Sequence, residues 1–78
     1  MSTYISDATV NEIIEKHCRI EYDRGRWIII ATLPDGMFYE NQPIKDIRLA
    51  FHKLPGGHQE KMAKRIVAEK YVEVMGLQ

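Results

Sequence analysis

The first regular pattern of apolar and polar residues has the period of a helix. Val10, Ile13 and Ile14 recur on one side, and Asn11, Glu12, Glu15 and Lys16 lie between them. Ser6 precedes this run and suits an N-cap, because its hydroxyl accepts from free amides of the first turn. The pattern predicts a helix over residues 7–17.

The period then changes to that of a strand. Residues 18–23 alternate between apolar and charged side chains, and a β-branched run follows from Trp27. Arg24-Gly25 between them fits a two-residue hairpin loop. The sequence therefore predicts an antiparallel hairpin with three opposed pairs: Cys18 with Ala31, Ile20 with Ile29, and Tyr22 with Trp27.

A second turn signal follows the hairpin. Pro34-Asp35-Gly36 combines a proline that presets φ with a glycine that accepts positive φ. Read as a three-residue loop, it predicts a short third strand over residues 37–40. Leu33 would then lie opposite Met37, and Ala31 opposite Tyr39.

Helical spacing returns after Pro43, which fits the first turn of a helix. Ile44, Ile47, Phe51 and Leu54 recur three or four residues apart. They predict a second helix that ends at Leu54.

A third helix is predicted from His58, with four residues facing inward: Met62, Ala63, Ile66 and Val67. It is expected to reach about residue 75, with Gly76 as its C-cap. The alternation in residues 71–75 leaves a fourth strand as the alternative. Residues 1–78 are thus expected to form a single α+β domain in the order α-β-β-β-α-α.

The predicted register gives the sheet two faces. One is a core face for the last two helices to cover: Cys18, Ile20, Tyr22, Trp27, Ile29, Ala31, Leu33, Met37 and Tyr39. The other carries more apolar residues than a solvated face needs. Its members are Arg19, Glu21, Ile28, Ile30, Thr32, Phe38 and Glu40.

Two explanations of the second face remain open, besides a register slip that would exchange the faces. The first helix could fold back over it. Alternatively, the face is a contact surface for another protein or a second copy. Its apolar centre would be Ile28, Ile30 and Phe38, and its charged rim Arg19, Glu21 and Glu40.

The charge is balanced over the whole chain but not along it. Eleven Lys/Arg match eleven Asp/Glu, yet residues 45–70 hold seven Lys/Arg against three Asp/Glu. Five residues there suggest nucleic-acid binding as the alternative function: Lys53, His58, Lys61, Lys64 and Arg65. Pro55-Gly56-Gly57, within this segment, is interpreted as a helix–helix corner, since a phosphate loop needs a strand before it.

No arrangement of residues predicts catalysis, and we expect no enzyme, cofactor or metal. Cys18 beside His17 is interpreted as a core cysteine rather than a nucleophile. His52 and His58 flank a turn without the paired spacing of zinc sites. The single cysteine and the absence of a signal-peptide or membrane-spanning pattern predict a cytoplasmic protein with no membrane contact.

One short motif resembles a known family. Phe51–Gly56 reads F-x-x-L-P-G, within residues 44–69 that are similar to the C-terminal helix pair of a small type I-F anti-CRISPR family. No family is assigned on this motif. The sequence predicts a non-enzymatic regulatory protein acting by protein–protein contact, as a steric inhibitor, adaptor or homodimer. Such a regulatory protein could be a phage or mobile-element accessory protein, for example an anti-CRISPR-like inhibitor.

Overall fold

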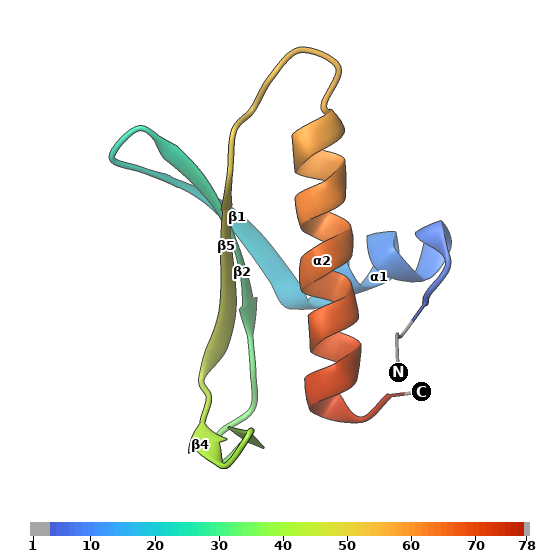
Figure 1. The fold of residues 1–78 in the computed structure, drawn as a ribbon, viewed down its shortest axis with the longest axis vertical. Coiled ribbons are helices and arrows are strands. Elements are labelled where there is room, and N and C mark those ends of the chain that lie inside the picture. The colour runs from blue at the N-terminus through green and yellow to red at the C-terminus, as the bar shows by residue number, and fades with distance from the viewer. Residues whose placement is uncertain (1–3, 78) are drawn as a thin grey trace.

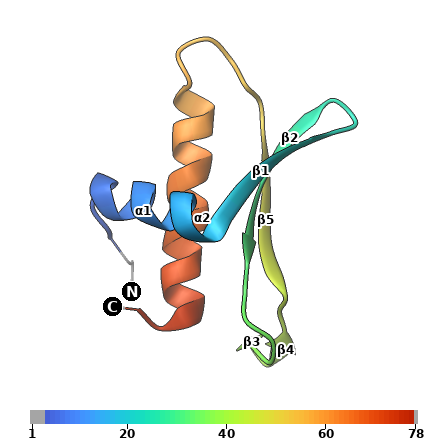
Figure 2. The same ribbon diagram turned by 180° about the vertical axis from the view of Figure 1, so that it is seen from behind.

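The computed structural model describes residues 4–77 and shows a small α+β domain (Figures 1 and 2). A three-stranded antiparallel sheet has the strand order β1-β2-β5, and β3 and β4 form a separate two-stranded ribbon. Both helices lie on the same side of the three-stranded sheet. The elements are α1 (Asp7–His17), β1 (Cys18–Asp23), β2 (Arg26–Thr32), β3 (Phe38–Tyr39), β4 (Gln42–Pro43), β5 (Asp46–Phe51) and α2 (His58–Met75).

The helix predicted over residues 7–17 is confirmed as α1. The Ser6 hydroxyl oxygen accepts from the Thr9 backbone N–H at 3.2 Å, as an N-cap does. Val10 and Ile13 are buried in the main hydrophobic cluster together with Ile29 of β2. Local signals therefore suffice to define this helix.

The β1–β2 hairpin also has the predicted register. Cys18 lies opposite Ala31, Ile20 opposite Ile29, and Tyr22 opposite Trp27. Arg24 and Gly25 both have positive φ, 54° and 81°, as a two-residue type I′ turn requires.

The helix predicted to end at Leu54 is wrong, and so is the C-terminal helix pair. Residues 46–51 form β5, which runs antiparallel to β2 with Ile47 opposite Ala31 and Leu49 opposite Ile29. Ile47, Leu49 and Phe51 also alternate with polar or small residues, so the segment fits both periods. As a strand it gives hydrogen-bond partners to the second edge of β2, which no other strand pairs in residues 4–77.

The predicted pairing across Pro34-Asp35-Gly36 is wrong as well. Ala31 lies opposite Ile47 rather than Tyr39, and the Leu33 N–H donates to the Lys45 carbonyl at 3.0 Å. The chain reverses instead in the β3–β4 ribbon, whose turn residues Glu40 and Asn41 have φ of 52° and 66°. The ribbon therefore connects β2 to β5.

α2 extends to Met75 with Gly76 as its C-cap, as predicted, so the alternative of a strand at residues 71–75 is wrong. Its inward face is only partly as expected. Ala63 and Val67 are buried, whereas Met62 and Ile66 are exposed. The described residues include no helix with the length and apolar character to cross a membrane.

The explanation that the first helix covers the second face of the sheet is also wrong. α1 packs against α2 and the sheet on the side that already holds the core (Figure 2). Within residues 4–77, no helix lies on the opposite side, which we call the outer face. The core face is therefore covered by α1 and α2 rather than by two C-terminal helices.

The predicted core face is itself only partly covered. Ile29, Ala31 and Leu33 are buried, and Cys18, Trp27 and Met37 pack against them. Ile20 and Tyr22 are exposed where the hairpin projects beyond the helices (Figure 1).

Candidate functional site

The apolar stripe of α2 is wider than the sheet beneath it. α2 packs on β5 and β2, and β5 is the last strand on that side of the sheet. Met62 and Ile66 are 51% and 52% exposed, although Ala63 and Val67, next to them in the chain, are 4% and 0% exposed. Two large apolar side chains therefore lie beside a sheet edge with no further strand to cover them.

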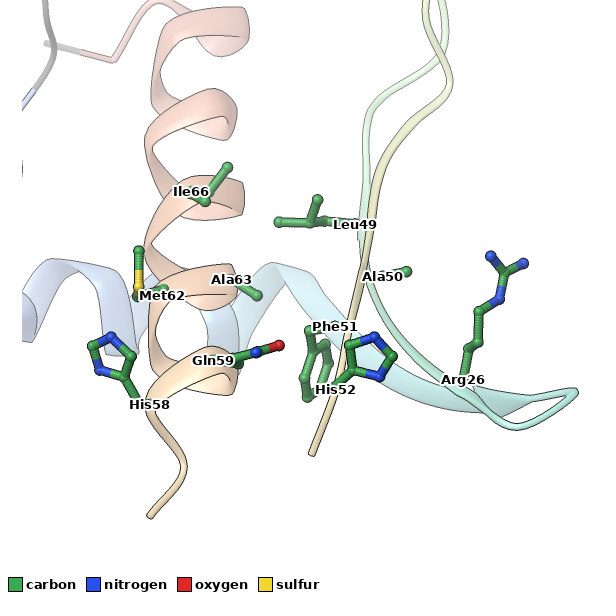
Figure 3. A pocket seen from close by; sticks show the side chains of 10 residues that line it. All are labelled: Arg26, Leu49, Ala50, Phe51, His52, His58, Gln59, Met62, Ala63 and Ile66. Atoms are coloured by element: carbon green, nitrogen blue, oxygen red, sulfur yellow. The ribbon is translucent and has the colours of Figure 1, made fainter. Parts of the chain in front are cut away.

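A hollow of about 590 Å³ follows this edge between β5 and α2, and we call it the edge groove (Figure 3). In the close-up, Leu49 points from β5 toward α2, and Gln59 points from α2 toward β5. The hollow extends around the strand to Arg26 and Ala50, so both sides of the β5 edge are accessible. The lining residues are Arg26, Leu49, Ala50, Phe51, His52, His58, Gln59, Met62, Ala63 and Ile66.

The free edge of β5 presents unpaired backbone groups. The Leu33–Lys45 hydrogen bond fixes which residues of this ladder are hydrogen-bonded pairs, because such pairs alternate along antiparallel strands. Residues 47, 49 and 51 therefore direct their backbone N–H and C=O groups at β2. Asp46, Arg48 and Ala50 direct theirs outward, as a strand that pairs with β5 would need.

The polar rim of the edge groove is basic. Arg26, His52 and His58 line it, and no Asp or Glu is among the lining residues. Its chemistry is thus an apolar floor, a row of backbone donors and acceptors, and side chains that favour acidic groups on a ligand. This combination suits a peptide strand better than a small-molecule substrate.

Four of the predicted contact residues lie together on the outer face. Arg19, Glu21, Ile28 and Ile30 alternate there with core residues on β1 and β2. Ile30 is only 1% exposed although no helix covers it, and its cross-strand neighbours on this face are Arg19 and Arg48. Arginine side chains in such positions bury their alkyl stems on apolar surface and keep their charged ends in water, so we infer that these two cover Ile30.

The outer-face charges are also paired with one another. Arg19 donates to Glu21 at 2.7 Å and to Thr32 at 3.0 Å, and Arg48 donates to Asp46 at 3.3 Å. The charged side chains of the outer face therefore pair with one another around the buried Ile30, whereas Ile28 on the same face is half-buried.

The remaining two contact residues lie apart from this group. Phe38, 62% exposed, is in β3, and Glu40 is in the turn of the ribbon. The ribbon contacts α2 through Tyr39, whose hydroxyl donates to Glu73 at 2.8 Å. Phe38 and Arg19 do share a hollow of about 570 Å³ at this end of the sheet, but Ile28 and Ile30 do not line it.

The residues predicted for nucleic-acid binding are largely engaged within the protein. Lys64 pairs with Glu60 at 3.0 Å, and Lys53 lies 4.5 Å from the Trp27 ring centroid. His58 lines the edge groove, and Lys61 is exposed beside a hollow of about 160 Å³ between α1 and α2.

Arg65 links α2 to the start of α1. Its guanidinium donates to the Asp7 carboxylate, to the Ile5 carbonyl at 2.8 Å and to Glu69 at 3.2 Å. The hydrogen bond to Asp7 is the main cause of its raised pKa, with Glu69 adding to it. Arg65 therefore serves the fold.

Cys18 and the histidines lie in different surroundings. Burial raises the pKa of the Cys18 thiol, which lowers the thiolate fraction at neutral pH. His17 stacks on Tyr71, with ring centroids 4.9 Å apart. His52 and His58 both reach the edge groove, but no cluster of three metal-ligating side chains occurs among the residues described.

Pro55-Gly56-Gly57 connects a strand to a helix, not two helices as predicted. Gly56 and Gly57 have φ of 89° and 69°, which favours glycine at both positions. A strand, β5, does precede this corner, as it would precede a phosphate loop, but the corner carries no Walker-type pattern. The F-x-x-L-P-G motif therefore does not join two helices, because Phe51 is the last residue of β5.

Neither the family models nor the curated proteins nor the solved structures gave a match to this chain. One signal for the site is present in the sequence: Ile47, Leu49 and Phe51 alternate with polar or small residues, as they do in a strand over residues 46–51.

Proposed function

We propose that this protein is a small binding protein without catalytic activity, and that the edge groove is its contact surface for another polypeptide. The observation that carries the proposal is the exposure of Met62 and Ile66 beside the free edge of β5. Apolar side chains give affinity when a partner removes them from water. Such contact serves a steric inhibitor, an adaptor or a self-associating protein.

The ligand that fits this surface is an extended strand. Its backbone would pair with the outward groups of Arg48 and Ala50, and alternate side chains would cover Leu49 and Ile66. An acidic residue on its other face would lie near Arg26 and His52, where the groove offers only basic groups. The proposal therefore specifies apolar side chains toward α2 and at least one carboxylate toward the outer face.

Selection from a library of random displayed peptides tests this function. Peptides are selected on the wild-type protein and counter-selected on Ile66→Lys, with Leu77→Lys as the matched control, because Leu77 is equally exposed at 55% and does not line the groove. The surviving peptides should lack proline and alternate apolar with polar or acidic residues. They should bind the control as well as the wild type.

Amide hydrogen exchange then locates the bound peptide. Binding should slow exchange at Arg48 and Ala50, whose N–H groups point outward, and leave the outward amides of β1 at Ile20 and Tyr22 unchanged. Protection confined to β1 or to the outer face would contradict the proposal. So would a selection in which Ile66→Lys retains every peptide.

A further inference from the structure

The edge groove fits one specific strand, which is β5 of a second copy of this chain. We infer that the protein self-associates by antiparallel pairing of β5 with β5 across a twofold axis at Leu49. The inference rests on the proposed function of the groove and names its occupant. The result would be one continuous sheet with three strands from each copy.

The backbone restricts the symmetric registers. Residues that direct their hydrogen-bonding groups outward must lie opposite one another. The twofold axis must therefore pass between the two copies of one residue, which lie opposite each other. With the axis at Leu49, Arg48 lies opposite Ala50 of the second copy. Asp46 then lies opposite His52 of the second copy, and every residue of β5 has a partner.

The side chains favour this register on both faces. Toward α2, the row is wholly apolar, with Leu49 against Leu49 of the second copy and Ile47 against Phe51 of the second copy. On the outer face, Asp46 of the second copy lies toward His52 and Arg26, and its carboxylate would exchange the exposed ion pair with Arg48 for one with Arg26. No Asp or Glu lines the groove, and β5 of the second copy would bring the carboxylate of its Asp46 to it.

Neighbouring registers are less favourable. An axis at Arg48 places two arginines opposite each other, and an axis at Ala50 places Lys53 of the second copy opposite Ile47, inside the apolar row. An axis at Ile47 pairs Asp46 with Arg48 but puts Lys45 opposite Leu49, inside the apolar row. Only the axis at Leu49 keeps the row toward α2 wholly apolar within β5 and also brings Asp46 of the second copy toward Arg26.

The helices support the same arrangement. Met62 and Ile66 are exposed on α2 and line the edge groove, where the strand from a second copy and its own α2 would arrive. Each copy would thus cover the apolar stripe that the other leaves exposed. The chain carries no net charge to oppose the association.

Light scattering over a range of concentrations provides the first test. The wild-type protein and Leu77→Lys should approach twice the 9.1 kDa of one chain, and Ile66→Lys should stay at one chain. A mass that grows past two chains would mean open head-to-tail pairing and would overturn the inference. A wild type that stays at one chain at every concentration would overturn it too.

Cysteine cross-linking tests the register in a Cys18→Ser background. Leu49→Cys should form a disulfide-linked dimer on mild oxidation, because opposed residues of a non-hydrogen-bonded pair have Cα atoms about 4.5 Å apart. Ala50→Cys is the matched control on the same edge and should cross-link far more slowly. Faster cross-linking through Ala50→Cys would overturn the register.

Failure of this inference is distinguishable from failure of the proposed function. If the protein is monomeric while selected peptides still protect the Arg48 and Ala50 amides, the groove binds strands of other proteins and self-pairing is rejected. If those amides are protected by neither peptides nor self-association, the proposed function is rejected with it.

Discussion

α1 and α2 leave both the outer face and the edge groove uncovered, yet the apolar residues of these two surfaces differ in how far they are exposed. On the outer face, Ile30 is 1% exposed and lies between Arg19 and Arg48. In the groove, Ile66 is 52% exposed. An apolar residue on an open surface thus becomes available for binding only where no long neighbouring side chain can lie over it.

The largest expected effect is the difference in unfolding free energy between substitutions of Ile30 and of Ile66. Ile30→Asp should destabilise the protein by about 3–5 kcal/mol, because it removes a buried side chain and places a charge in its site. Ile66→Lys, measured at a concentration where self-association is absent, should change stability by no more than about 0.5 kcal/mol. Urea unfolding followed by Trp27 fluorescence measures both.

Equal losses in the two variants would remove the distinction between the surfaces. The distinction would also fail if Ile30→Asp kept the wild-type unfolding midpoint, since Ile30 would then be as accessible as Ile66.

An intermediate effect tests the arginine cover itself. Replacing Arg19 and Arg48 together by alanine should lower the free energy of unfolding more than replacing both by methionine, which keeps a long apolar stem. The expected difference is about 1 kcal/mol, from the apolar area of Ile30 that alanine uncovers. Equal stability of the two double variants would mean that the arginines act through charge alone.

The smallest expected effect concerns the basic residues near α2. Lys64 and Arg65 are held in ion pairs, so little affinity for phosphate is expected. Fluorescence anisotropy with a labelled DNA duplex and a labelled RNA strand should show weak binding with a shallow dependence on salt. A steep fall of affinity with salt that is lost in Lys53→Ala or Lys61→Ala would favour the nucleic-acid alternative over the edge groove.

Part of the fold could be predicted because its signals are local. Ser6 and the 3.6-residue spacing define α1, and the Arg24-Gly25 turn sets the register of β1 and β2. The i,i+4 pairs Glu12–Lys16 and Glu60–Lys64 also form as their spacing indicates. Each depends on residues that are close in the chain.

The candidate site could not be predicted in this way. Ile28 and Ile30 looked exposable because they fall on the second face of the hairpin, but Arg48 of β5 completes the cover over Ile30. Met62 and Ile66 looked buried because they belong to the stripe of α2, but the sheet ends at β5. In both cases the position of β5 sets the exposure of these side chains, and the sequence predicts residues 46–51 as a helix.

By itself, the sequence determined an α+β chain with a capped first helix, a registered hairpin and a last helix that ends at Gly76. Periodicity, caps and turn residues act over a few positions, so they needed no tertiary context. Residues 44–54 fit both a helix and a strand, and the unpaired edge of β2 selected the strand. The tertiary structure alone therefore decided which apolar residues are covered and where the binding surface lies.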